Sequence, residues 1–254
     1  MIPGMIPINL SGKTAIVTGS GQGLGASTAA LLAHAGANVV INYFHDPQGV
    51  NLRRAEEAAA AIGGQALLVE ADVRDPAAVV AMFDRTMDRF GRVDIVVNNA
   101  GILRDRSIRK MTVEEWNAVI GTNLTGVFHV CKLAAEKIAD GGRLVNVSSI
   151  SAFQGFFGQS NYAAAKGGVV SLTKVLSREL AKRNITVNAV APGVVLTEMG
   201  ITIPEEARRE MLKSIPLGRF GEPEEVGRVI LFLCSDLASY VTGQTIHVSG
   251  GWWV

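Results

Sequence analysis

Two side chains in the middle of this 254-residue chain have the types and spacing needed for proton transfer to an oxygen. Tyr162 and Lys166 are four residues apart, so on a helix they would share one face. An ammonium group beside a phenol favours the phenolate and should lower the phenol pKa from about 10 toward neutrality. Ser149 lies thirteen residues upstream. The pair indicates carbonyl or alcohol redox chemistry, although a solvated helix face can have the same spacing.

A glycine-rich segment near the N-terminus could hold the cofactor for such chemistry. Residues 18–25 read TGSGQGLG, directly after a predicted strand and before a predicted helix. Gly19 permits a tight turn, and Gly23 and Gly25 permit close approach of a phosphate and of the helix. The amide groups at the helix N-terminus would then face a pyrophosphate. An ordinary glycine-containing loop is the alternative.

Three further segments follow predicted strands, where ligands bind in open α/β sheets. Asp72, next to Val73, has a carboxylate that could accept the adenine amino group. The small residues at 98–101 (NNAG) would allow a cofactor to approach the backbone. Backbone groups at 192–197 (PGVVLT) could hold a nicotinamide amide. Together with the glycine turn, these segments predict a dinucleotide site.

The elements that must position these residues alternate along the whole chain. Apolar runs at 14–19, 38–43, 66–69, 94–98, 143–148, 186–190 and 245–248 are separated by helical patterns at 24–35, 48–62, 76–90, 113–138, 162–182 and 223–233. This alternation predicts a doubly wound α/β fold with a parallel sheet covered by helices on both faces. Because no linker divides the chain, we expect one domain over residues 1–254. Residues 196–220 are predicted to form a substrate lid, or else a surface helix pair.

Composition excludes several classes of protein. Hydrophobic residues make up 48% of the chain and charged residues 19%, which is too apolar for disorder. A net charge of +1 predicts neither a nucleic-acid nor a membrane-surface partner. Residues 1–10 do not resemble a signal peptide, and we expect no membrane span. Cys131 and Cys234 are predicted to be buried thiols, the four histidines lack metal-ligand spacing, and a cytoplasmic protein is expected.

The combined motifs resemble the short-chain dehydrogenase/reductase family. They are residues 18–25 and 98–101, Asn123, Ser149, Tyr162, Lys166, and Pro192 with Gly193, and the resemblance extends from about residue 11 to residue 254. It implies a single Rossmann-type domain with seven parallel strands, usually assembled as a homotetramer. Subunit contacts are then expected at helices 113–138 and 162–182 and at Trp252 and Trp253.

The resemblance also implies a role for each matching residue. Tyr162 would be the general acid, Lys166 would bind the nicotinamide ribose and lower the phenol pKa, and Ser149, preferred over Ser148 and Ser151 by its spacing, would hydrogen-bond the carbonyl. Asn123 would kink a helix and hold a water molecule in a proton relay. The expected substrate contacts are Ser149, Gln159 and Tyr162. The expected cofactor contacts are Gly19, Ser20, Gln22, Gly23, Leu24, Tyr43, Phe44, Asp72, Val73, Asn99, Ala100, Gly101, Tyr162, Lys166, Pro192, Gly193, Val195 and Thr197.

NADP(H) is favoured over NAD(H), which stays possible. NAD-preferring relatives carry an acidic residue at the end of the second strand, whereas this chain reads NYFH at 42–45, with no carboxylate before Asp46. Against NADP, Gln22 stands where many NADP-dependent relatives have arginine. Arg53 and Arg54 could supply the missing charge only if the loop brings them in, and a solvated helix start is the alternative.

Within the family, the local sequence most resembles 3-oxoacyl-thioester reductases that act on acyl carrier protein or CoA. The matching stretches are NNAGILRD at 98–105, KMTVEEW at 110–116, FGQSNYAAAK at 157–166 and IPLGRFGEPEE at 215–225. Lys182 and Arg183 retain part of a basic patch for an acidic carrier protein, but Asp140 stands where those relatives often have a basic residue. An NAD(H)-dependent alcohol, sugar or small-ketone dehydrogenase is the main alternative, and a redox sensor without turnover is a further one.

Overall fold

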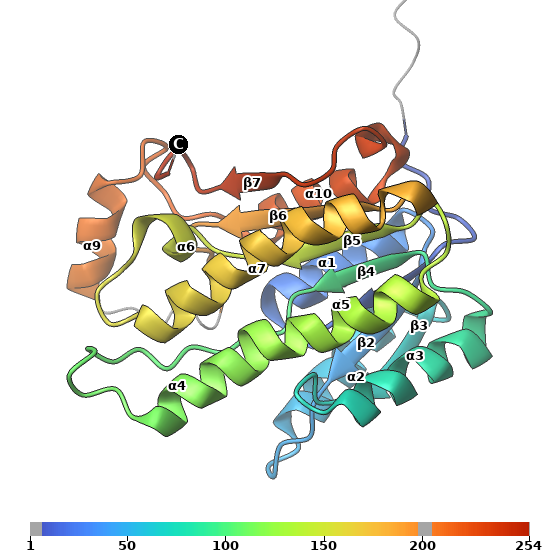
Figure 1. The fold of residues 1–254 in the computed structure, drawn as a ribbon, viewed down its shortest axis with the longest axis horizontal. Coiled ribbons are helices and arrows are strands. Elements are labelled where there is room, and N and C mark those ends of the chain that lie inside the picture. Colours follow the sequence, from blue (N-terminus) through green and yellow to red (C-terminus); the bar gives the residue numbers. More distant parts are fainter. Residues whose placement is uncertain (1–6, 198–204, 254) are drawn as a thin grey trace, which may run out of the picture.

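Seven apolar segments form one parallel sheet in the order β3-β2-β1-β4-β5-β6-β7 (Figure 1). The computed structural model describes residues 7–197 and 205–253. The strands are β1 (Thr14–Val17), β2 (Asn38–Tyr43), β3 (Ala66–Glu70), β4 (Ile95–Asn98), β5 (Arg143–Val147), β6 (Thr186–Pro192) and β7 (Thr245–Val248). The chain order reverses between β1 and β4, and ligands bind at the carboxyl ends of strands next to such a point.

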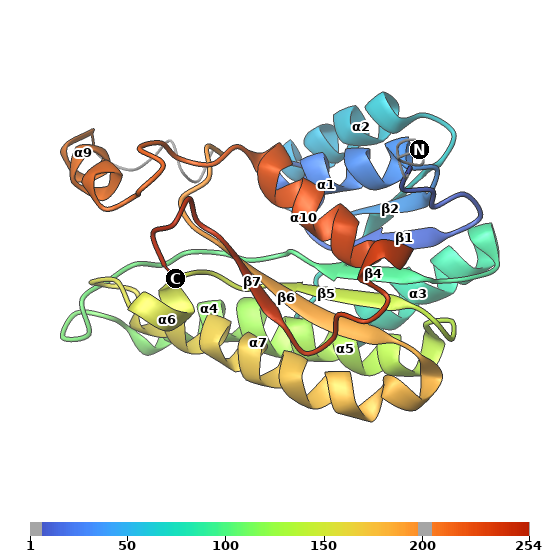
Figure 2. The ribbon, with the colours of Figure 1, turned by 90° about the horizontal axis from the view of Figure 1, so that it is seen from above.

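Helices cover both faces of this sheet, as Figure 2 shows. On one face lie α1 (Gly23–His34), α2 (Val50–Ile62) and α10 (Pro223–Cys234); on the other lie α3 (Pro76–Phe90), α4 (Val113–Ile120), α5 (Gly126–Lys137) and α7 (Ser160–Glu179). The short α6 (Ser151–Gln154) precedes α7, and α9 (Glu205–Lys213) precedes α10. Each face has its own buried apolar cluster, and both cysteine thiols are buried and unpaired. The predicted fold class is confirmed.

Local capping explains why these helices begin where they do. The Asp75 side chain accepts the amide of Ala77, and Pro76 occupies the first position of α3. At the start of α4, Thr112 and Glu115 each accept the other's backbone amide in a reciprocal capping box. These end signals place α3 at the predicted bounds.

The predicted helix 113–138 forms one run, Val113–Lys137, in which the π-helical turn η1 (Gly121–Thr125) joins α4 to α5. By length and composition alone, this run is long and apolar enough to cross a membrane. The core helix of a globular protein meets the same criterion. Val130 and Ala134 of α5 are fully buried in the cluster that α5 shares with α3 and α7. Packing against the sheet therefore accounts for the apolar sequence.

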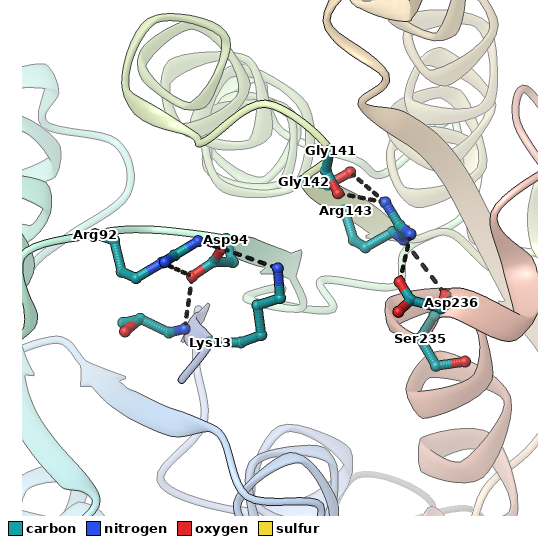
Figure 3. A network of polar contacts seen from close by, with 9 residues as sticks. Lys13, Arg92, Asp94, Gly141, Gly142, Arg143, Ser235 and Asp236 are labelled. Atoms are coloured by element: carbon teal, nitrogen blue, oxygen red, sulfur yellow. Dashed lines mark hydrogen bonds and ion pairs between the residues drawn. The ribbon is translucent and has the colours of Figure 1, made fainter. Parts of the chain in front are cut away.

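A polar network lies at the amino ends of β1, β4 and β5 (Figure 3). The buried Asp94 carboxylate accepts the Thr14 amide at 2.9 Å and the Arg92 Nη2 at 2.6 Å, with Lys13 Nζ at 3.6 Å. Nearby, the buried Arg143 guanidinium donates to the Ser235 carbonyl and pairs with Asp236 at 3.1 Å. The carboxylate of Asp94 is buried, whereas its cationic partners reach solvent. These ion pairs offset the cost of burying its negative charge.

Replacing Asp94 by Asn should therefore destabilise the fold. The amide cannot pair with both cations, and we expect a loss of about 2 kcal/mol. For a chain of this size that corresponds to a Tm lower by about 4 to 8 °C in a thermal scan. Glu224→Gln is the matched control, because its pair with Arg228 is exposed and should contribute well under 1 kcal/mol. Equal shifts for the two variants would contradict a structural role for Asp94.

Candidate active site

The predicted site residues gather around one cleft of about 850 Å³ at the carboxyl ends of the strands. The predicted residues that line it are Gly19, Gln22, Gly23, Leu24, Tyr43, Phe44, Asp72, Val73, Asn99, Ala100, Gly101, Ser149, Gln159, Tyr162, Lys166, Pro192, Gly193, Val195 and Thr197. Ser20 and Asn123 do not line it; both are fully buried behind it.

The glycine turn is shaped by close backbone contacts. Gly19 has a φ of +62°, and a Cβ there would lie 2.9 Å from the Cα of Ala100. A Cβ on Gly25 would lie 2.4 Å from the Gly19 carbonyl oxygen, so neither position has room for a side chain. The side chain of Gln22, the residue before α1, accepts no hydrogen bond from the first amides of the helix. The first amides of α1 thus face the cleft in the manner that suits a pyrophosphate.

The end of β4 is fastened to this turn. Asn99 Nδ2 donates to the carbonyls of Thr18 and Gly19, each at 3.0 Å. The amides of Asn99 and Ala100 both donate to the Thr18 hydroxyl, at 3.0 and 3.1 Å. The Asn99 side chain is thus occupied within the protein, which leaves backbone and small side chains at 99–101 to face a cofactor.

Ser20 and Asn42 hold the turn to the end of β2. The Ser20 hydroxyl accepts the Asn42 amide at 3.0 Å and donates to the Val17 carbonyl at 2.7 Å. Asn42 Oδ1 accepts the Gly19 amide at 3.0 Å. The Ser20 side chain therefore stabilises the turn, and the predicted contact of Ser20 with the cofactor would come from its backbone.

The far end of the cleft, beyond the glycine turn, is lined by Tyr43, Phe44, Arg54 and Arg74. Arg54, from α2, borders the cleft and donates a hydrogen bond to Gln22 Oε1. Arg53, its neighbour, is exposed and does not border the cleft. Of the two arginines that the sequence left open, Arg54 is therefore the one that borders this end of the cleft.

The carboxylates near this end are already engaged. Asp72 accepts two bonds from Arg74 Nε, at 2.9 and 3.0 Å, and this bonding lowers the Asp72 pKa. Asp46 accepts the amides of Val50 and Asn51 at the start of α2, and these bonds lower its pKa. Asp46 does not line the cleft, so it does not replace the ribose-binding acid of NAD-preferring relatives.

A chain of polar side chains surrounds the predicted reaction centre. Tyr162 hydrogen-bonds Ser149, whose hydroxyl lies 3.2 Å from that of Ser151. Ser151 donates to Gln159 Oε1 at 2.8 Å, and Gln159 Nε2 donates to Asp105 at 2.8 Å. This chain fixes the two hydroxyls that a carbonyl oxygen would meet.

The pKa of Tyr162 is raised to about 12, opposite to the direction predicted from the lysine alone. Burial is the main cause, the Ser149 hydrogen bond works against it, and the negative charge of Asp105 adds to it. The prediction considered one neighbouring charge and omitted the cost of burying a phenolate. The phenol thus keeps its proton throughout the neutral range.

Lys166 lies behind the tyrosine and is 3% exposed. Its Nζ donates to the Val147 carbonyl at 2.7 Å and lies 5.6 Å from the centre of the Tyr162 ring. Burial lowers its pKa to about 8. Because this pKa lies close to neutral pH, the protonation of Lys166 is sensitive to any charge brought into the cleft.

Asn123 lies in the π-helical turn η1, which agrees with the kink that the resemblance implied. Its side chain exchanges two hydrogen bonds with the backbone of Ile102, each at 2.9 Å. A Cβ on Gly101 would be 3.4 Å from Asn123 Oδ1 and 3.6 Å from Lys166 Nζ. Asn123 and Lys166 therefore both approach Gly101, and the backbone of Ile102 holds the side-chain amide of Asn123 in place.

Comparison with known proteins accounts for this arrangement. Residues 19–253 match the family described as Enoyl-(Acyl carrier protein) reductase. The chain is 44% identical over 246 residues to the 3-oxoacyl-[acyl-carrier-protein] reductase FabG of Thermotoga maritima, covering 96% of this chain and 99% of that one. The FabG of Aquifex aeolicus is also 44% identical, with 96% and 98% covered. The chain belongs to the short-chain dehydrogenase/reductase family.

Solved structures agree with membership of the short-chain dehydrogenase/reductase family. A Brucella melitensis structure titled short-chain dehydrogenase/reductase SDR:Glucose/ribitol dehydrogenase has a TM-score of 0.92 and 33% identity, covering 98% of this chain and 100% of that one. A Serratia marcescens short-chain dehydrogenase/reductase has a TM-score of 0.89 and 34% identity, with 96% and 98% covered. The chain is thus an NAD(P)-dependent oxidoreductase of this family, and the predicted family and enzyme class are confirmed.

Several side chains at this family site were not predicted from the sequence. Ser151 was set aside because of its spacing, and Asp105 and Trp252 were not considered for the site. Trp252 borders the cleft and packs on Phe156, with ring centres 5.2 Å apart. The NNAGILRD stretch contained Asp105 as a signal, whereas nothing in the sequence indicated that the C-terminal indole would reach the cleft.

Proposed function

We propose that this protein reduces a 3-oxoacyl thioester to the 3-hydroxyacyl thioester with NADPH, using Tyr162 as general acid. The observation that carries the proposal is the hydrogen-bonded pair of Ser149 and Tyr162 in the cleft that also holds the glycine turn. The 44% identity to 3-oxoacyl-[acyl-carrier-protein] reductases supports the substrate class.

The residues present suit a reduced nicotinamide cofactor, which supplies the hydride when bound. The uncapped start of α1 would receive the pyrophosphate, and backbone groups at 192–197 would orient the nicotinamide. Ser149 would donate a hydrogen bond from its hydroxyl to the substrate carbonyl. Tyr162, whose raised pKa keeps it protonated, would give its proton to the oxygen as that oxygen becomes an alkoxide, a stronger base than a phenolate. Lys166 would bind the ribose and stabilise the phenolate that results.

Initial rates with a panel of substrates test this proposal. NADPH and NADH would each be offered with acetoacetyl-CoA, with the neutral thioester acetoacetyl-N-acetylcysteamine and with simple ketones. The proposal expects fast oxidation of NADPH with both thioesters and slow oxidation with the ketones. Turnover confined to NADH, or to the ketones, would overturn the substrate and cofactor assignment while keeping the enzyme class.

The second candidate is an NAD(H)-dependent sugar, alcohol or small-ketone dehydrogenase. One observation favours it: the Brucella structure with the TM-score of 0.92 is titled glucose/ribitol dehydrogenase. The same catalytic residues would serve the oxidative direction. NAD⁺ reduction with a panel of polyols and sugars, in the same assay, distinguishes the two candidates.

We further propose that residues 196–220 form a lid over the substrate. In the part of this segment that the structure describes, Met211 of α9 lines the cleft and Ile215 is buried. α9 lies at the end of the sheet where the strand arrowheads point (Figure 1). Met199, Ile201 and Ile203 lie outside the described residues.

We also propose a homotetramer. Apolar side chains on the predicted contact helices support it, since Phe128 on α5 is 47% exposed and Val175 on α7 is 52% exposed. Trp252 and Trp253 are half-buried against Phe156 and Phe153 of the same chain, so they need less cover than predicted. Sedimentation as a monomer would overturn this proposal.

A further inference from the structure

A basic segment lies at the substrate end of the cleft. Between residues 104 and 110 the chain has four basic side chains and one acidic one, although the net charge of the whole protein is only +1. Arg104 and Asp105 line the cleft, and Ile108, Arg109 and Lys110 are exposed beyond it. Positive charge is therefore concentrated where a substrate would enter.

The acidic side chains near this segment are largely engaged elsewhere. Asp105 accepts a hydrogen bond from Gln159, and Glu115 pairs with Arg106 at 2.9 Å. Within the described part of the chain, Arg109 and Lys110 have no ion-pair partner. These two cations therefore face solvent with their charge uncompensated.

Exposed apolar side chains accompany these cations. Ile108 is 70% exposed and Phe157 is 93% exposed. Both line a second hollow of about 680 Å³, together with Arg109 and Lys110. This hollow shares Phe156, Phe157 and Gln159 with the main cleft, so the two lie next to each other. A surface of this composition, a pair of large apolar groups beside unpaired cations, suits an acidic protein partner.

In the basic patch that the sequence placed at Lys182 and Arg183, the arginine is engaged within the chain. Arg183 pairs with Asp140 at 2.7 Å and donates to the carbonyls of Ala135, at 2.6 Å, and Ile138 at the end of α5. Its guanidinium therefore holds a helix C-terminus, and Asp140 partly balances its charge. The sequence did not indicate these contacts of Arg183, because they depend on how two segments distant in the chain come together.

We propose that the surface formed by Ile108, Arg109, Lys110 and Phe157 docks an acidic acyl carrier protein and directs its thioester arm into the cleft. This inference rests on the proposed 3-oxoacyl reductase function. Charge complementarity favours the carrier over a second copy of this chain. A two-fold contact places the same patch on both subunits, so it would bring two sets of unpaired cations together.

The test compares three acetoacetyl thioesters, attached to acyl carrier protein, to CoA or to N-acetylcysteamine, with NADPH saturating. The variant is Arg109→Glu with Lys110→Glu, which reverses both charges. The matched control is Arg178→Glu with Lys182→Glu, one exposed arginine and one exposed lysine on the side of the molecule where the resemblance placed the patch. We expect kcat/KM for the carrier substrate to fall roughly tenfold or more in the variant only. The salt dependence of that kcat/KM should weaken in parallel.

Each other outcome overturns the docking proposal in a different way. An equal fall with the CoA substrate would mean that the surface binds the nucleotide phosphates of CoA. A fall in the control alone would restore the patch at Lys182. Dissociation of the variant in sedimentation would make the surface a subunit contact. Absence of turnover of the neutral thioester by the unmodified protein would instead overturn the proposed function itself.

Discussion

Replacing Tyr162 by Phe should lower kcat/KM for carbonyl reduction by about 1,000-fold, within the range expected for loss of a positioned general acid. The phenyl ring fills the same space, so only the hydroxyl and its proton are removed. Binding of NADPH, followed by titration of its fluorescence, should change by less than about twofold. A loss of rate with binding intact would show that the hydroxyl acts in the chemical step.

The chain provides a matched control for this prediction. Of its three tyrosines, Tyr240 is fully exposed, and Tyr240→Phe should leave both rate and binding unchanged. Ser149→Ala should lower the rate by roughly 10- to 100-fold, because it removes one hydrogen bond to the carbonyl and one to Tyr162. Turnover of Tyr162→Phe within tenfold of the unmodified protein would contradict the mechanism.

The sequence predicted the sheet and the cofactor turn well because short-range chemistry decides both. Buried parallel strands are near-continuous apolar runs, and Asn38–Tyr43 and Thr245–Val248 formed at their predicted bounds. Pro76 and Gly91 signal the ends of α3 in the same local way. The four-residue α6 was missed because so short a segment carries no clear periodicity.

The parts of the site that the sequence did not reveal depend on contacts between distant segments. The raised pKa of Tyr162 follows from its burial and from Asp105, which lies 57 residues away in the chain. Arg183 pairs with Asp140 and donates to the end of α5, contacts that its place in the sequence did not indicate. Spacing can bring Tyr162 and Lys166 to one helix face, but it contains no information on solvent or on remote partners.

Arg54 shows the same limit, and it bears on the cofactor form that we propose. Its position on α2 says nothing about the cleft, yet it borders the end lined by Tyr43 and Phe44 and is oriented by Gln22. Asp72, the carboxylate that lines this end of the cleft, is bonded to Arg74. A 2′-phosphate on the adenosine ribose would therefore meet a cation and little repulsion.

Replacing Arg54 by Gln should accordingly reduce kcat/KM for NADPH and leave that for NADH within about threefold. A charge-assisted hydrogen bond to phosphate contributes about 1.5 to 3 kcal/mol, or roughly 10- to 150-fold. Arg53→Gln is the control, because the adjacent exposed arginine should matter little. Inhibition constants give a reading independent of turnover: 2′,5′-ADP should bind more weakly to the Arg54 variant, whereas 5′-AMP should not. If both cofactors lost affinity equally, Arg54 would be supporting the glycine turn through Gln22, and the preference for NADPH would have to come from another residue.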